Sequence, residues 1–302
     1  MSEALIERIR HLKEQRHAVI LAHYYQRPEI QDVADFVGDS LGLSRTAADT
    51  DAETILFCGV HFMAETAAIV CPDRQVIVPD AHAGCPMADM ITVRQLRAMK
   101  QQQPGARVVA YVNTSAAVKA EADICCTSAN AVEALRHMGG DGPIIFVPDR
   151  NLAEYAAESS GVAVIPWPGY CPTHVRILPR DIHALKDAHP QARVVVHPEC
   201  RREVRQLADA IASTAGMIRY AAESDAAEFI IGTELGLLHA LRKRCPEKAF
   251  FAASDLADCP NMKLNSLEKM VWALEDMQHR VEVPAAIAER ARGAIERMLS
   301  IG

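Results

Sequence analysis

The sequence lacks a basic excess, long apolar runs and a signal-peptide core. Its 302 residues include 32 Lys and Arg against 39 Asp and Glu, which gives a formal net charge of -7. A general nucleic-acid-binding protein needs a basic face, so this balance argues against that class, although a local pocket can still attract small anions. Apolar runs such as residues 19–22 are far shorter than the roughly 20 residues that span a membrane. We therefore expect neither a nucleic acid nor a membrane as a partner.

The cysteine content leads to a second exclusion. The N-terminal segment carries acidic residues within a helix-like pattern, unlike a secretory leader, so we expect a cytoplasmic protein. Cytoplasmic thiols stay reduced, so the nine cysteines do not predict a disulfide framework. Each cysteine is then either a small buried apolar residue or a ligand or nucleophile.

The chain repeats one pattern three times. In each copy an apolar strand ends in a polar residue, a hydroxyl residue follows seventeen positions later, and a Cys-Pro pair follows after 62, 60 and 62 positions. The strand-end residues of successive copies lie 88 and 86 positions apart. The landmarks of the three copies are His23, Ser40 and Cys85; Tyr111, Ser128 and Cys171; and His197, Thr214 and Cys259. Agreement of several landmarks in all three copies indicates an internal repeat.

Each copy predicts strand, helix, strand, helix, strand and helix. Short continuous apolar strands between amphipathic segments are typical of a parallel sheet covered on both faces. We expect three three-layer α/β/α units related by pseudo-threefold symmetry around a central cavity, over residues 1–86, 87–171 and 172–260. C-terminal helices over 261–302 are expected to complete the first unit. Such sheets bind ligands beyond the carboxyl ends of their strands, where the polar landmarks fall.

The recurring cysteines carry the sharpest chemical signal. Cys85, Cys171 and Cys259 occupy the same landmark, and the proline after each disfavours a helix there. Three thiolates on a common axis suit an iron–sulfur cubane that leaves one iron open as a Lewis acid. Two alternatives stay open, namely buried structural cysteines and a zinc site of three cysteines with an added histidine. Structural roles are expected for the cysteines that do not recur in all units: Cys58, Cys71, Cys125, Cys126, Cys200 and Cys245.

Hydroxyl groups precede helix-like segments in each copy. A helix N-terminus presents free N–H groups to anions, but Ser and Thr are also common as plain caps, and both roles can coincide. The residues concerned are Ser40, Ser128, Ser213 and Thr214.

Imidazoles and carboxylates gather near the same strand ends. His23 and His197 are either substrate ligands or hydrogen-bonded scaffold residues. Glu199 lies on the same side of an extended chain as His197 and is either a proton shuttle or an exposed acid. His174, three residues after Cys171, either binds substrate or orients its loop. The acids at 32, 35 and 39 are better explained by a solvated helix face or helix N-terminal charge than by a second metal.

Eight segments together resemble the quinolinate synthases, the [4Fe–4S] enzymes of NAD biosynthesis. They cover nearly the whole chain, from about residue 18 to 270. The segments are 23–32 (HYYQRPEIQD), 37–41 (VGDSL), 57–66 (FCGVHFMAET), 83–89 (AGCPMAD), 111–114 (YVNT), 126–131 (CTSANA), 197–200 (HPEC) and 213–217 (STAGM).

The resemblance implies a reaction, a cofactor and a set of site residues. Iminoaspartate and dihydroxyacetone phosphate would condense to quinolinate with loss of phosphate and water, and the enzyme that supplies iminoaspartate is a candidate partner. Cys85, Cys171 and Cys259 would hold the [4Fe–4S] cluster. The resemblance gives Tyr25 a role in catalysis, and we expect the same of Glu199 and His197 because they share one strand end. Substrate contacts would come from His23, Ser40, Tyr111, Asn113, Ser128, His174, His197, Glu199, Ser213 and Thr214.

The chain departs from some members of the family at its last cysteine, and two other classes of protein are alternatives to an enzyme. Some members place the last cysteine in a Cys-x-x-Cys-x-x-Cys run, whereas Cys259 has no near cysteine neighbours, so we expect no local disulfide switch. An electron-transfer or redox-sensing iron–sulfur protein would normally bring a fourth cysteine and no ring of hydroxyl and imidazole groups. A non-catalytic metabolite-binding protein would bind dicarboxylates without a cluster.

Overall fold

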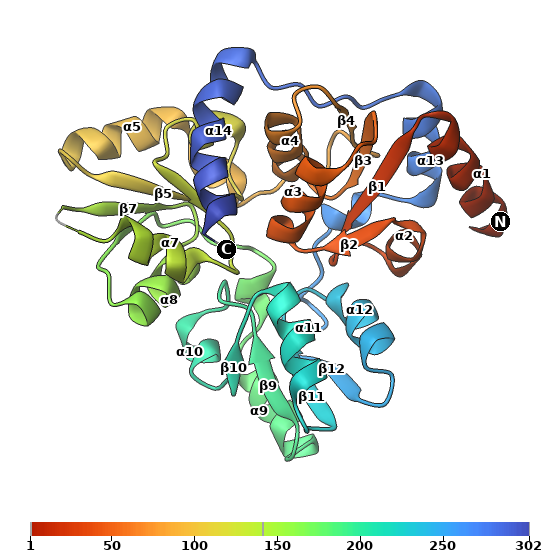
Figure 1. Ribbon diagram of the computed structural model, residues 1–302. Helices are drawn as coiled ribbons and strands as arrows, with labels where there is room; N and C mark the ends of the chain where they lie inside the picture. Colours follow the sequence, from red (N-terminus) through yellow and green to blue (C-terminus); the bar gives the residue numbers. More distant parts are fainter. Residues whose placement is uncertain (1, 141, 302) are drawn as a thin grey trace.

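Three separate four-stranded sheets make up the fold of the computed structural model, which describes residues 2–140 and 142–301 (Figure 1). All strand pairs within these sheets are parallel. The strand orders are β2-β1-β3-β4, β6-β5-β7-β8 and β10-β9-β11-β12, so the same order recurs three times. The predicted α/β class with three parallel-sheet units is confirmed.

The elements follow the repeat along the chain. The first group is α1 (Ser2–Gln15), β1 (Ala18–His23), α2 (Pro28–Val33), β2 (Phe36–Gly38), α3 (Ser40–Asp49), β3 (Thr54–Cys58), α4 (His61–Val70), β4 (Gln75–Ile77), the 3-10 turn η1 (Ala88–Met90) and α5 (Val93–Gln102). The second is β5 (Arg107–Tyr111), α6 (Ala116–Lys119), β6 (Ile124–Cys126), α7 (Ala131–Met138), β7 (Ile144–Val147), α8 (Arg150–Ser160), β8 (Ile165–Pro166), η2 (His174–Arg176) and α9 (Pro179–Ala188). The third is β9 (Arg193–Val196), α10 (Arg202–Arg205), β10 (Ala210–Ile211), α11 (Thr214–Glu223), β11 (Glu228–Gly232), α12 (Leu237–Arg244), β12 (Ala249–Ala252), η3 (Met262–Leu264), α13 (Leu267–Asp276) and α14 (Ala285–Ser300).

The sequence predicted three strands in each unit, and the fourth strand was missed. The missed strands are β2, β6 and β10, which are two or three residues long and lie at one edge of each sheet. A strand this short is too brief to show a period of two or a continuous apolar run, so its pattern does not stand out from a loop.

Both faces of the first sheet are covered, as its apolar strands predict. Ile20 and Leu56 pack with α1 and α13 in one buried cluster, whereas Leu21 and Phe57 belong to the large cluster on the opposite face. Adjacent residues of a strand point to opposite faces, so the continuous apolar runs follow directly from this double burial.

The two C-terminal helices lie in different places (Figure 1). Helix α13 lies against α1, whereas α14 contacts α4 of the first unit together with α6 and β6 of the second. The proposed unit boundaries remain a prediction. Within the described part of the chain, none of the helices has the length and apolar character needed to cross a membrane.

Candidate functional site

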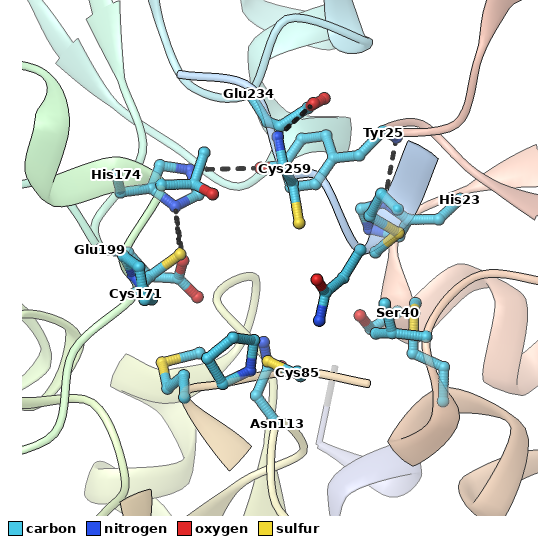
Figure 2. A pocket seen from close by; sticks show the side chains of 18 of the residues that line it. His23, Tyr25, Ser40, Cys85, Asn113, Cys171, His174, Glu199, Glu234 and Cys259 are labelled. Atoms are coloured by element: carbon cyan, nitrogen blue, oxygen red, sulfur yellow. Dashed lines mark hydrogen bonds and ion pairs between the residues drawn. The ribbon is translucent and has the colours of Figure 1, made fainter. Parts of the chain in front are cut away.

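A cavity of about 200 Å³ lies where the three units meet, beyond the carboxyl ends of their strands (Figure 2). Side chains from all three units line it. The predicted site residues on its wall are His23, Tyr25, Ser40, Cys85, Tyr111, Asn113, Ser128, Cys171, His174, His197, Glu199, Thr214 and Cys259. Ser213 is not on the wall, because it is the N-cap of α11 and its Oγ accepts the Gly216 N–H at 3.2 Å.

Two buried carboxylates fix two of the three cysteine loops. The Cys171 N–H donates to Asp149 Oδ2 at 3.0 Å, and the Cys259 N–H donates to Glu234 Oε1 at 3.1 Å. Strand register makes Asp149 and Glu234 equivalent, since each stands two residues beyond the last position that pairs with the central strand. Neither acid was predicted from the sequence, although both lie at one landmark of the repeat, shared by the second and third units. Val60 takes the equivalent place in the first unit.

The loop of Cys85 is held differently. The His61 N–H donates to Ala83 O at 2.7 Å, and the side-chain amide of Asn261, from the C-terminal side of the third unit, donates to Gly84 O at 2.8 Å. Burial raises the pKa of the Cys85 thiol to about 12 and also raises that of Cys259. A free thiol here is therefore neutral, and a bound cation would have to displace its proton.

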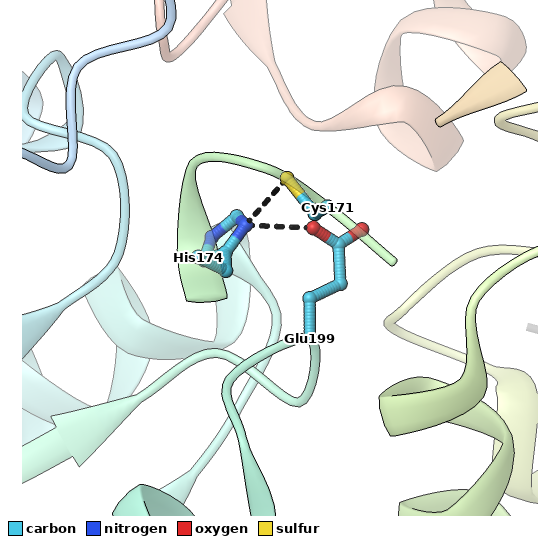
Figure 3. Close-up of side chains that lie close together, drawn as sticks. All are labelled: Cys171, His174 and Glu199. Atoms are coloured by element: carbon cyan, nitrogen blue, oxygen red, sulfur yellow. Dashed lines mark hydrogen bonds and ion pairs between the residues drawn. The ribbon is translucent and has the colours of Figure 1, made fainter. Parts of the chain in front are cut away.

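Glu199 is buried at the centre of a hydrogen-bonded network. Its Oε1 accepts the Tyr111 hydroxyl at 2.6 Å, and its Oε2 lies 2.7 Å from His174 Nδ1 (Figure 3). Burial alone would raise the pKa of Glu199, but His174 beside it and the hydrogen bond from Tyr111 outweigh burial and hold it below the usual value. The carboxylate form is thus favoured in this network.

Thr233, which was not predicted as a site residue, extends the network to Tyr25. Thr233 Oγ1 lies 2.6 Å from Tyr25 Oη and 2.9 Å from His174 Nε2. His174 Nδ1, on the other side of the ring, lies 3.2 Å from Cys171 Sγ as well as beside Glu199. The imidazole therefore connects one cysteine, one carboxylate and one hydroxyl, and no sequence signal marked Thr233.

The two strand-end histidines share one local geometry. The Tyr25 N–H donates to His23 Nδ1 at 3.1 Å, and the Glu199 N–H donates to His197 Nδ1 at 3.3 Å. Burial lowers the pKa of each to about 3, helped by Lys263 at His23 and by His174 at His197. Because Nδ1 accepts, Nε2 carries the hydrogen in both neutral rings. His197 Nε2 lies 3.1 Å from the Ser128 hydroxyl, which then accepts.

The hydroxyl residues are placed at helix starts, as predicted, but they are not all caps. Asp39 and Ser213 cap α3 and α11, so Ser40 and Thr214 are the first residues inside these helices. Capping therefore does not occupy the Ser40 and Thr214 side chains, and both line the cavity. Asn130 occupies the N-cap position of α7 without a side-chain capping hydrogen bond, and Ser128 lies before that position.

The acids at 32, 35 and 39 do not converge on a second metal site. Asp32 pairs with His239 and Lys243, each on α12, at 2.9 and 2.8 Å. Asp35 accepts the Ile20 N–H at 2.8 Å, and Asp39 accepts the N–H of Gly42 in its capping role. Each carboxylate thus has a separate structural partner.

Comparison with known proteins identifies the family of this chain. The profile of the family described as "Quinolinate synthetase A protein" matches residues 7–300. "Quinolinate synthase" of Methanosarcina barkeri is 56% identical over 297 residues, which are 98% of this chain and 97% of the relative. The protein of the same name from Desulforudis audaxviator is 54% identical over 301 residues, which are 100% and 99% of the two chains. The resemblance inferred from the sequence motifs is confirmed, and this chain belongs to the quinolinate synthetase A family of enzymes.

Proposed function

We propose that this enzyme condenses iminoaspartate with dihydroxyacetone phosphate to form quinolinate, with loss of phosphate and water. The family and the names of the relatives support quinolinate as the product. The observation that carries the proposal is the composition of one cavity, in which a cysteine from each unit faces a buried carboxylate, two tyrosines and three imidazoles. The enzyme that supplies iminoaspartate is the partner we propose.

The three cysteines fit a [4Fe–4S] cluster. Cys85, Cys171 and Cys259 line one cavity, but within the described chain these three Sγ atoms do not together form a group whose members all lie within 4.8 Å of one another. Four ligands of one zinc ion lie about 4 Å apart or less, whereas a cubane attaches each thiolate to a different iron. The spacing therefore favours a cluster over a three-cysteine zinc site. When bound, a cluster with one iron free of thiolate would supply a Lewis acid.

Proton transfer would fall to the buried network. Ring formation requires removal of protons from carbon, and a carboxylate held in its ionised form can accept them. Glu199 is that carboxylate, and Tyr111 and His174 orient its two oxygens. Tyr25, which reaches the same imidazole through Thr233, is the second candidate for proton transfer.

Anion binding would fall to the hydroxyl and imidazole groups on the cavity wall. Ser40 and Thr214 lie at the N-termini of two ten-residue helices from different units, where free N–H groups and the helix dipole favour carboxylate or phosphate. His23, whose ring is neutral with hydrogen on Nε2, can donate one more hydrogen bond. Asn113, Ser128 and His197 complete the proposed contacts.

One experiment tests both the cofactor and the reaction. Protein prepared without oxygen should show iron–sulfur absorbance with about four iron and four sulfide per chain, and should form quinolinate from the two substrates. Replacing Cys85, Cys171 or Cys259 by Ser should abolish both, whereas Cys58→Ser or Cys245→Ser should leave both in place. Retained iron and turnover in Cys259→Ser would contradict the ligand assignment. A cluster without quinolinate formation would favour an electron-transfer or redox-sensing protein.

A further inference from the structure

A second, more compact ligand set shares the cavity with the three thiols. Cys171 Sγ, His174 Nδ1 and a Glu199 carboxylate oxygen all lie within 4.8 Å of one another (Figure 3). His174 Nδ1 is 3.2 Å from the sulfur and 2.7 Å from Glu199 Oε2. The His174 and Glu199 side chains are only 2% and 3% exposed. Among the residues that the structure describes, this is the only such group of three.

The atoms of this set match the preferences of zinc. Zinc binds thiolate, imidazole nitrogen and carboxylate oxygen, and in a tetrahedral site the ligand atoms lie about 3.3–3.7 Å apart. The two measured separations are slightly shorter, so the side chains need to open by less than about 1 Å. One thiolate and one carboxylate together balance the charge of a divalent ion, which removes the main obstacle to burying it.

Neighbouring hydroxyls already orient two of the three ligands. Thr233 Oγ1 lies 2.9 Å from His174 Nε2, so Nδ1 faces the sulfur and the carboxylate. The Tyr111 hydroxyl donates to Glu199 Oε1 at 2.6 Å, which leaves Oε2 toward His174. A metal-binding imidazole is normally held in this way through its other nitrogen, and such outer contacts change affinity by roughly 10–100-fold.

We propose that the chain, when it carries no cluster, binds one zinc ion through Cys171 Sγ, His174 Nδ1 and the Glu199 carboxylate, with the fourth position open to the cavity. Zinc and a cluster then compete for Cys171, so zinc would block cluster assembly. Zinc ranks above ferrous iron in affinity for such mixed sites, which makes the competition favourable to zinc. The zinc site shares only Cys171 with the proposed cluster and does not depend on the proposed reaction.

Metal titration of the cluster-free, full-length protein tests this site. Zinc added in competition with a chromogenic chelator should bind at one ion per chain. Cobalt in place of zinc should give the visible bands of a four-coordinate site and a near-ultraviolet thiolate band with the intensity of one sulfur rather than three. Protein preloaded with zinc should also assemble iron and sulfide more slowly than metal-free protein.

Matched cysteine variants separate this site from a three-thiol site. Cys85→Ser and Cys259→Ser should keep the zinc affinity and the one-sulfur cobalt band, although both should fail to hold a cluster. Cys171→Ser, His174→Gln and Glu199→Gln should each weaken zinc binding by more than the roughly 10–100-fold expected for an outer contact, and Thr233→Val by about tenfold. Circular dichroism of each variant checks its folding.

Three results would overturn the zinc proposal without contradicting the cluster assignment. A three-sulfur cobalt band in the unaltered chain, or loss of zinc in Cys85→Ser as in Cys171→Ser, would assign zinc to the three thiols. Absence of stoichiometric zinc binding would leave Cys171, His174 and Glu199 as a hydrogen-bonded network only. Failure of the proposed function would instead appear as a missing cluster or missing quinolinate, with zinc binding unchanged.

Discussion

Glu199 is the acid on which the cavity network converges, so its substitution is the most direct test of proton transfer. Glu199→Gln keeps the shape and can still accept from Tyr111, but it removes the titrating group. We expect unchanged iron content, substrate binding within about tenfold, and a loss of turnover of roughly 10²-fold or more. Turnover and iron analysis on the same preparation measure both. Normal turnover would transfer the role to Tyr25 or His197.

Thr214 and Ser213 are adjacent residues with different environments, which makes them a matched pair. Thr214 faces the cavity, and Thr214→Ala should weaken binding of an anionic substrate by about ten- to a hundredfold, since a hydrogen bond to a charged group contributes roughly 1.5–3 kcal/mol. Ser213→Ala removes the cap of α11 and should lower the free energy of unfolding by about 1 kcal/mol. Steady-state kinetics and urea unfolding of both variants distinguish the effects. Unchanged kinetics in Thr214→Ala would remove it from the binding site.

At the scale of the elements, a repeated aspartate joins the edge strand of each sheet to the central strand. Each carboxylate accepts the N–H of a central-strand residue, and each aspartate N–H donates back to the carbonyl of that same residue. The pairs, with the carboxylate distances, are Asp35 with Ile20 at 2.8 Å, Asp123 with Val108 at 2.6 Å and Asp209 with Val194 at 2.8 Å. The aspartates lie 88 and 86 positions apart, the spacing of the other landmarks.

Asp209→Ala tests this link. The substitution leaves the buried Val194 N–H without its acceptor, so the free energy of unfolding should fall by about 1–3 kcal/mol at neutral pH. Burial alone would raise the pKa of Asp209, but the Val194 N–H and Arg193 outweigh it and lower the pKa. The stabilisation is therefore present above the unfolded value of about 3.9 and is lost as the pH falls through the lower folded value. Urea unfolding at several pH values should show the free energies of unfolding of Asp209→Ala and the unaltered protein converging in acid. A difference that persists in acid would contradict the assignment.

How much of the structure the sequence predicts depends on how far apart in the chain the interacting residues lie. The repeat located Cys85, Cys171 and Cys259 because one spacing recurs three times, and continuous apolar runs located the strands buried on both faces. The edge strands β2, β6 and β10 were too short to show an apolar pattern of their own. Thr233 could not be predicted, because its role depends on contacts with Tyr25 and His174, which are 208 and 59 positions away in the sequence.

At the scale of the whole molecule, three buried polar side chains, one from each unit, make equivalent contacts with a neighbouring unit. Gln31 donates to Gly236 O at 3.0 Å, and Arg205 donates to Asn151 O at 2.8 Å. The Lys119 ammonium lies 5.4 Å from the centre of the Phe62 ring. The donors are 88 and 86 positions apart, and the three residues that they contact are equivalent in the strand register. The first unit thus contacts the third, the third the second, and the second the first, which closes a ring around the cavity.

Arg205 should contribute more to this ring than Lys119, because it satisfies more backbone carbonyls. Its Nη1 donates to Asn151 O, Pro198 O and Cys200 O, whereas Lys119 donates to one carbonyl, that of Thr114. Arg205→Met leaves buried carbonyls without a donor, so the free energy of unfolding should fall by roughly 3 kcal/mol or more.

The stabilities of three methionine variants test whether these polar contacts, rather than apolar packing, hold the units together. Lys119→Met should lower the free energy of unfolding by less than Arg205→Met does, because it also removes a buried ammonium group. Burial disfavours the charged form of that group and lowers its pKa. Arg202 lies on the same short helix as Arg205 but is 61% exposed, so Arg202→Met should stay within about 0.5 kcal/mol of the unaltered protein. The turn that Arg205 holds through Pro198 O and Cys200 O also carries Glu199, so Arg205→Met should lower turnover as well. Urea unfolding and turnover of the three variants measure both effects. Equal stability of Arg205→Met and Arg202→Met would mean that the apolar clusters alone close the ring.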